Sequence, residues 1–335
     1  MYKVLSKADL PRLIERWMEQ ATVYAPVRQG DFTKFEPLSD PAQADLHYAA
    51  NTRYPPKSLF LPQSEVMFRV KGGEFESTED EVSSRVILGI HACDTRALQL
   101  LDGVFLAEDY QDPYWAKKRE QTTLVVLGCA DPCETCFCTS VGSGPFDKRD
   151  ADVMLIDVGD EYVADVRNEK GQALFDHLPD ASQEQIDKSR QVQAAAAAKM
   201  RKKPFEGEGI KDKLYGLFDS DFWPRIQQSC LGCGVCTFLC PTCHCFDIVD
   251  EAQRNERVRN WDTCMFRSYS LEASGHNPRP TNMERTRQRI MHKYAYFVEL
   301  YDEIGCTGCG RCVRYCPVDL DIRQIIRSVQ SWEEE

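Results

Sequence analysis

Two stretches of the chain repeat one spacing of cysteines, C-x2-C-x2-C-x3-C-P. The first runs from residue 230 to Pro241 and the second from residue 306 to Pro317. Thiolates with this spacing ligate pairs of cubane iron–sulfur clusters, and the fourth cysteine of each run ligates the other cluster. The spacing therefore predicts two [4Fe-4S] clusters with crossed ligands. The first cluster takes Cys230, Cys233, Cys236 and Cys316, and the second takes Cys306, Cys309, Cys312 and Cys240.

Zinc and disulfides are the alternative uses of these thiols. Structural zinc sites take pairs of Cys-x2-Cys knuckles set far apart, whereas each run here has three cysteines in succession and then a Cys-Pro. The chain has 16 cysteines and shows no secretory signal pattern. We therefore expect a cytoplasmic protein, in which thiols stay reduced and are available to metals.

A second group of cysteines lies in the first half of the chain, behind two apolar segments. Residues 85–90 and 122–128 are typical of buried strands, and in an open α/β sheet the carboxyl ends of such strands line one crevice. Cys93 and Cys129 directly follow these segments, and a Cys- and Gly-rich loop comes next. We expect a third cluster here, held by Cys93, Cys129, Cys136 and Cys138. Cys133 is then the spare and is able to replace one of the four, while buried free thiols and a zinc site are the alternatives.

A helix is expected over residues 95–101, next to this group. Asp94 has the side chain of a good N-cap for it. A position at the start of a helix should also lower the pKa of the Cys93 thiol, which suits both metal ligation and a reactive thiol.

The strand and helix patterns divide the chain into three parts. Residues 1–180 are expected to form an α/β or α+β domain that contains the Cys-rich loop. Residues 181–225, with an alanine run at 194–198 and a basic end, indicate a helical connector. Residues 226–335 are expected to form a mostly helical, ferredoxin-like 2[4Fe-4S] domain with a long insertion over residues 246–300.

The insertion contains two features with open interpretations. Cys243, Cys245 and Cys264 are either buried thiols around the clusters or, with His244 or His292, ligands of a further metal site. The following segment is helical and basic although the whole chain is acidic. Its cations either form a solvated face or face the clusters and raise their potentials. They are Arg285, Arg287, Arg289, His292 and Lys293.

Composition and missing motifs narrow the function. The net charge of −12 disfavours nucleic acid as a partner, and no apolar run is long enough for a membrane span. The chain has no G-x-G-x-x-G after a strand, no G-x4-G-K-[ST], and no residue set suited to hydride or proton transfer. The chemistry left to it is one-electron transfer, so we expect flavin and nickel to belong to partner chains.

Several segments resemble one known family. CPTCHCFD, WDTCMF, GHNPRPTNMERTRQRIMHKYAYFVELY and CTGCGRCVRYCPVDLDI are similar to the iron–sulfur β subunit of cytoplasmic sulfhydrogenases, the NAD(P)-linked [NiFe] hydrogenases. The family also includes the related iron–sulfur chains of anaerobic sulfite reductase and of heterodisulfide-reductase-associated NADH oxidoreductases. HACDTRALQLLDGVF, YQDPYWAKKRE and CADPCETCFCTSVGSGP extend the resemblance over most of residues 55–335.

The resemblance implies a non-catalytic electron-transfer subunit of an anaerobic, cytoplasmic oxidoreductase. Its partners would be an FAD- and [2Fe-2S]-containing subunit that handles NAD(P)H and a hydrogenase, sulfite reductase or heterodisulfide-reductase module. Two other functions stay open. One is a self-contained reductase with the N-terminal cluster as its active site, and the other is a scaffold with structural zinc.

Overall fold

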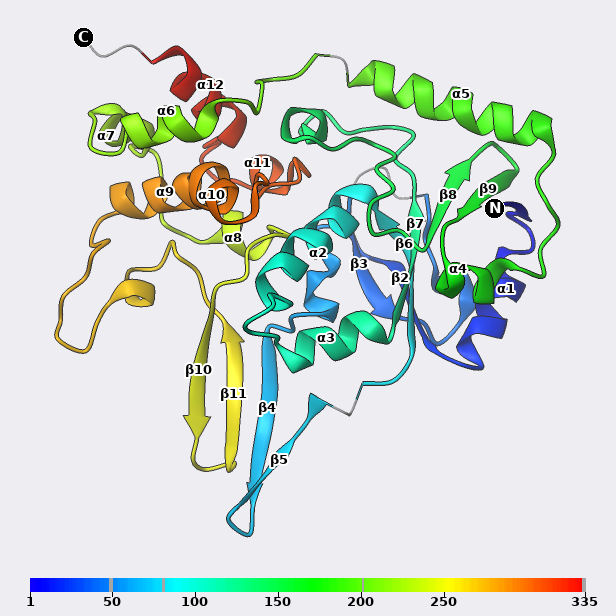
Figure 1. Ribbon diagram of the computed structural model, residues 1–335, viewed down its shortest axis with the longest axis horizontal. Coiled ribbons are helices and arrows are strands. Elements are labelled where there is room, and N and C mark those ends of the chain that lie inside the picture. Colours follow the sequence, from blue (N-terminus) through cyan, green and yellow to red (C-terminus); the bar gives the residue numbers. More distant parts are fainter. Residues whose placement is uncertain (48–50, 80–81, 201, 333–335) are drawn as a thin grey trace.

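The computed structural model describes residues 1–47, 51–79, 82–200 and 202–332. Its largest element is a seven-stranded mixed sheet with the order β1-β9-β8-β7-β6-β2-β3 (Figure 1). The strands are β1 (Tyr2–Ser6), β2 (Thr22–Gln29), β3 (Phe32–Pro37), β6 (Arg85–His91), β7 (Thr122–Leu127), β8 (Val153–Asp157) and β9 (Glu161–Val166). Neighbours among β8, β7, β6 and β2 are parallel, and the outer pairs are antiparallel. The N-terminal part is thus a mixed α and β structure, within the fold class expected.

Helices cover both faces of this sheet because its central strands are buried on both sides. In β7, Val125 and Leu127 face one core, while Leu124 and Val126 face the other. Side chains of α1 (Leu10–Met18) and α4 (Glu169–Phe175) complete the first core. Those of α2 (Ala92–Phe105) and α3 (Pro113–Glu120) complete the second. The alternation follows from the period of two in a strand.

The carboxyl ends of β6 and β7 lie side by side, because the two strands are parallel neighbours from the Arg85↔Thr122 pair to the His91↔Leu127 pair. This confirms that residues 85–90 and 122–128 form adjacent parallel strands. The register shifts between Leu88 and Ile90, where Gly89 has a φ of +81°. Such bulges are common next to functional sites, since they re-aim the residues that follow.

A second, four-stranded sheet joins distant parts of the chain, in the order β10-β11-β4-β5 (Figure 1). Its strands are β4 (Ser64–Lys71), β5 (Glu74–Ser77), β10 (Phe246–Glu251) and β11 (Glu256–Trp261). Buried Arg259 of β11 reaches Glu65 of β4 at 2.5 Å and also pairs with Asp112. The mostly helical C-terminal domain is therefore not confirmed, because part of the expected insertion forms strands that pair with the first half of the chain.

The remaining helices lie in the C-terminal part, and most of them contribute to a separate apolar core (Figure 1). They are α6 (Ile210–Gly216), α7 (Phe222–Ile226), α8 (Val235–Phe238), α9 (Asn282–Met291), α10 (Phe297–Tyr301), α11 (Arg311–Arg314) and α12 (Ile322–Ser331). Leu214 of α6 and Trp223 of α7 belong to this core together with Ile290 and Ile326. Residues 210–226 thus pack with the C-terminal part. The domain limits at residues 180 and 225 stay a prediction.

Helix α5 (Gln183–Lys199) is the longest helix in the described ranges, with 17 residues. It begins at Ser182 with a capping box that includes Gln185, and it packs on β8 and β9. No helix within those ranges is both long and apolar enough to cross a membrane.

Candidate iron–sulfur centres

The four cysteines assigned to the first cluster line one cavity. Cys230 and Cys233 come from the loop before α8, Cys236 from α8 itself, and Cys316 from the turn after α11. Gly234 turns the chain into α8 with a φ of +75°, a value that glycine adopts without strain. Cys233 is exposed, so this cavity reaches the surface. We call it the first cavity.

The four cysteines assigned to the second cluster line another cavity, the second cavity. Cys306, Cys309 and Cys312 come from the second run, and Cys240 comes from the first. Cys240, Cys306 and Cys309 are buried. The structure thus brings together both crossed sets predicted from the spacing. That these thiolates ligate iron stays a prediction.

Two buried cations face these thiols. Lys293 Nζ lies 3.2 Å from Cys240 Sγ and also donates to Thr242 Oγ1 at 2.8 Å. Arg289 borders both cavities, and its Nε is buried without a hydrogen-bond partner. Burial opposes the charge of Lys293, but the nearby Cys240, Cys243 and Cys306 outweigh it and raise the pKa of the ammonium. Burial likewise opposes the charge of Arg289, and the surrounding cysteines raise its pKa.

This arrangement fits clusters that carry negative charge. A buried cation without an anion is strongly unfavourable, and within the described residues neither Lys293 nor Arg289 forms an ion pair with a carboxylate. Thiolates bound to a cubane would supply the missing anions. Because Arg285, Arg289 and Lys293 are all buried, the structure favours the cluster-facing interpretation of the basic helix over a solvated face.

A π-helical turn positions these cations. Helix α9 continues directly into the π-helical residues His292–Tyr296 and then into α10. Lys293 and Tyr294 of this turn are buried, at 5% and 1% exposure, and face the second run of cysteines. Single π-turns inside helices occur frequently at functional sites. The periodicity of the sequence predicts a helix here, but it does not predict that one turn of the helix contains the extra residue of a π-helix.

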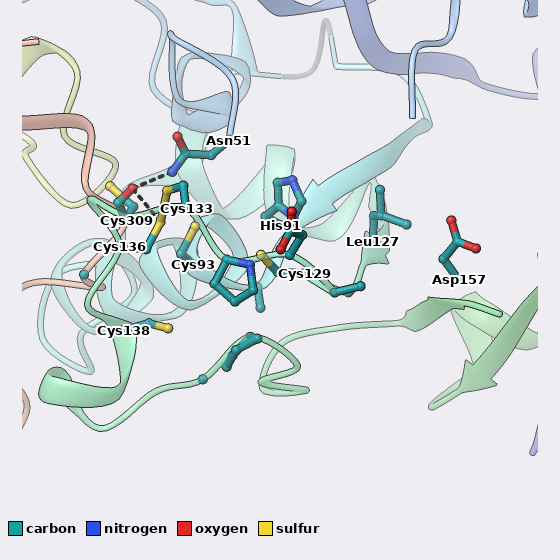
Figure 2. A pocket seen from close by; sticks show the side chains of 18 of the residues that line it. Asn51, His91, Cys93, Leu127, Cys129, Cys133, Cys136, Cys138, Asp157 and Cys309 are labelled. Carbon is teal, nitrogen blue, oxygen red and sulfur yellow. Dashed lines mark hydrogen bonds between the residues drawn. A yellow bond between two sulfur atoms is a disulfide. The ribbon is translucent and has the colours of Figure 1, made fainter. Parts of the chain in front are cut away.

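The N-terminal cysteines line a third cavity at the carboxyl ends of β6 and β7, with a volume of about 250 Å³. Figure 2 shows Cys93, Cys129 and Cys138 around it, with Cys133 and Cys136 joined as a disulfide. The structure thus brings the four predicted ligands to one cavity together with the spare. Cys136 must be released from Cys133 before it can act as a ligand, so the choice between these two cysteines stays open.

The expected low pKa of Cys93 is wrong. Burial raises the pKa of this thiol, and the charge of Asp94 raises it further. These two effects outweigh any lowering of the pKa by the position at the start of the helix. Burial also raises the pKa of Cys129 to about 11 and that of Cys138 to about 12. A bound metal would be needed to hold these thiols as thiolates.

The N-terminal loop packs against the second run of cysteines. Phe137 N donates to Gly308 O at 2.8 Å, and Asn51 Nδ2 donates to Cys309 O at 2.6 Å. Cys309 borders both the second and the third cavity. The two sites are therefore neighbours that share one residue.

Asp94 also takes part in the contact between the N-terminal part and the second run of cysteines. It is not the N-cap that the sequence predicts. Helix α2 begins at Ala92 with His91 as its N-cap, which places Asp94 in the first turn. There its carboxylate accepts from both terminal nitrogens of Arg311, at 2.6 and 2.8 Å, and both side chains are buried. This ion pair joins the helix that bears Cys93 to α11, which begins two residues after Cys309.

The three remaining cysteines, Cys243, Cys245 and Cys264, line a fourth cavity with His244 and His292. Within the part of the chain that the structure describes, no group of three or more His, Cys, Asp or Glu side chains is placed to hold a single metal ion. This applies to all four cavities.

The crossed cysteine sets and the matched domain define the class of protein. Residues 229–320 match the 4Fe-4S dicluster domain family, so the chain is an iron–sulfur protein of the dicluster type. It is also 32% identical, over 98% of both chains, to the protein named sulfhydrogenase 2 subunit beta of Pyrococcus furiosus. The chain therefore belongs to the sulfhydrogenase β-subunit family, and the resemblance found in its motifs is confirmed. No solved structure matches it.

Proposed function

We propose that this chain is the electron-transfer subunit of a multisubunit oxidoreductase. It relays electrons between an FAD- and [2Fe-2S]-containing subunit that handles NAD(P)H and a terminal module of the hydrogenase, sulfite reductase or heterodisulfide-reductase type. Two [4Fe-4S] clusters occupy the first and second cavities, and a third occupies the N-terminal cavity. Flavin and nickel belong to the partners, and the complex is cytoplasmic.

One observation carries this proposal: the three cavities adjoin in series. Cys312 borders the first and second cavities, and Cys309 borders the second and third. Electrons pass between neighbouring clusters without any group on this chain having to move. The chain's own residues exclude water and set the potentials. Buried Phe137 lines the second cavity and buried Tyr294 lies beside Cys306, and Lys293 and Arg289 favour the reduced clusters.

The two ends of the series suit exchange with partners. At one end Cys233 is exposed and Leu231 is 64% exposed. At the other end lies the larger third cavity. We propose that one partner docks beside each end, because electron transfer between proteins requires clusters that lie close to the surface.

Reduction by NAD(P)H tests this function. The anaerobically purified chain should lose visible cluster absorbance with dithionite, but with NAD(P)H only after the flavoprotein partner is added. Adding the terminal module should then restore the absorbance as electrons leave. A colourless chain, or one that NAD(P)H reduces in the absence of the flavoprotein, would contradict the proposal.

A self-contained reductase is the second candidate, because the third cavity is the roomiest of the cysteine-lined sites. Asp131 and Asp157 border it and would be able to contact a substrate. This candidate predicts that the isolated chain oxidises a reduced redox dye continuously when a reducible sulfur compound is present. The electron-transfer proposal predicts a single reduction and no turnover.

A further inference from the structure

The fourth cavity has the donors of a metal centre, although neither cysteine run contributes to it. The β10–β11 hairpin brings two of its cysteines together, since Phe246 pairs with Trp261 and Asp262 N donates to Cys245 O at 3.0 Å. Cys245 directly precedes this hairpin and Cys264 closely follows it. Cys243 lies one turn before β10 on the same wall.

A histidine completes the set. His244 Nδ1 lies 3.1 Å from Thr242 O, and because a carbonyl only accepts, Nδ1 is the donor. Its Nε2 then keeps a free lone pair, and a histidine ligand to a metal typically has its other ring N–H held in this way. The ring of His292 packs edge-on against His244, with centroids 5.4 Å apart, and holds its orientation.

Buried positive charge lies around this cavity and favours the binding of an anionic group in it. Lys293 and Arg289 form part of its wall, and no carboxylate does. A third cation, Lys57, is 3% exposed, donates from Nζ to Cys243 O at 2.5 Å and lies 4.2 Å above the ring of Trp261. Lys293 and Arg289 also border the second cavity, so anionic groups in the two cavities would share these buried cations. Lys57 faces the fourth cavity's Cys243.

We propose that this cavity holds a further iron–sulfur cluster, ligated by Cys243, Cys245, Cys264 and Nε2 of His244. Thiolate and imidazole donors together suit iron–sulfur centres. Within the described residues, no group of three or more His, Cys, Asp or Glu side chains is placed around one metal ion. The space between the thiols is narrow, about 10 Å³, but the second cavity, inside the matched dicluster domain, has the same volume.

The place of this cluster would make the second cluster a branch point. Arg289 and Lys293 border both the second and the fourth cavities, so the two centres would be neighbours. This inference rests on the proposed function in one respect. That function assigns a [4Fe-4S] cluster to the second cavity, which would be the neighbour of the new centre.

Iron content tests the proposal in the anaerobically purified complex. Cys245→Ala and Cys264→Ala should each remove about four iron atoms per complex, one cubane, compared with the wild type. The iron and sulfide of the other clusters should be kept in both variants, and this shows that the chain has folded. Unchanged iron and sulfide in both variants would overturn the proposal.

A histidine variant provides a second test that does not depend on losing a cluster. His244→Cys should keep the iron content and shift one resonance signal, because a thiolate replaces an imidazole. The control His276→Ala changes an exposed histidine and should leave every signal unchanged. An unchanged spectrum for His244→Cys would contradict the ligand set. The NAD(P)H experiment fails or succeeds independently of both tests, since it does not depend on a fourth cluster.

Discussion

At the scale of single residues, buried cations lie beside the thiols that we propose as cluster ligands. Lys293 Nζ lies 3.2 Å from Cys240 Sγ in the second cavity. Two charges at about 4 Å interact by about 4 kcal/mol at an effective dielectric constant of about 20. Each added electron makes the cluster more negative, so this cation stabilises the reduced state and raises the potential.

The charge of Lys293 can be removed with little change of shape. We predict that Lys293→Met lowers the potential of the second cluster by on the order of 100 mV, since about 59 mV corresponds to a tenfold change for one electron. A redox titration followed by paramagnetic resonance measures this shift. Lys188→Met, which changes an exposed lysine of α5, is the control and should shift no signal. Equal potentials in the two variants would show that Lys293 does not act on the cluster.

The crossed ligands give a second prediction at this scale. Cys240→Ser should alter the cluster held by the second run, and Cys316→Ser should alter the cluster held by the first run, because each side chain lies in the other run's cavity. The resonance spectrum of each variant shows which signal changes. If each substitution alters the cluster of its own run, the assignment is wrong.

At the scale of elements, the contact between residues 133–138 and the second cysteine run determines how the third cavity meets the second. Gly310 has a φ of +75°, and a Cβ there would lie 2.6 Å from the carbonyl oxygen of Thr135. Gly142 has a similar φ of +72°, but nothing lies within 4 Å of its Cβ position. Alanine at either position would have the same unfavourable backbone conformation. Only at position 310 would its side chain also clash with the N-terminal loop.

This difference can be measured by substitution. Gly142→Ala should destabilise the protein by about 1 kcal/mol, the cost of a left-handed backbone for alanine. Gly310→Ala should cost about 2 kcal/mol more, because the N-terminal loop has to move away from the second run. Thermal unfolding of the two anaerobic variants, compared with the wild type, tests this. Equal midpoints would show that the loop contact is unimportant.

The sequence predicts elements whose pattern is local and misses those that depend on distant pairing. Strands β6 and β7 are continuous apolar runs followed by cysteines, so both the strands and their shared crevice are predictable. The pairing of β11 with β4 joins residues about 190 positions apart, and no local pattern in the polar, charged β10 and β11 specifies it. The π-helical turn and the Arg311–Asp94 ion pair likewise have no local sequence pattern that predicts them.

Among the site residues, those with a fixed spacing were the predictable ones. Each cysteine run defines its own ligand set, and the structure gathers both sets. Lys57 carried no signal in the sequence, because its approach to Cys243 depends on the packing of the whole chain. Burial also reversed the expected pKa direction of Cys93, since local position at a helix start does not reveal how deeply a thiol is enclosed.

At the scale of the whole molecule, four cysteine-lined cavities in the described residues adjoin one another through shared lining residues. The third lies at the carboxyl ends of β6 and β7, and the second joins it to the first through shared cysteines. Cations from α9 and the π-helical turn face the second and fourth. The proposed relay depends on this series of adjoining cavities.

The most direct test of this account is a paramagnetic resonance spectrum of the fully reduced, anaerobically purified chain. Adjacent reduced clusters interact magnetically, so the account predicts a complex spectrum of coupled [4Fe-4S] signals that changes when Cys316→Ser alters the first cluster. Zinc in place of iron, or one isolated signal that Cys316→Ser leaves unchanged, would contradict it.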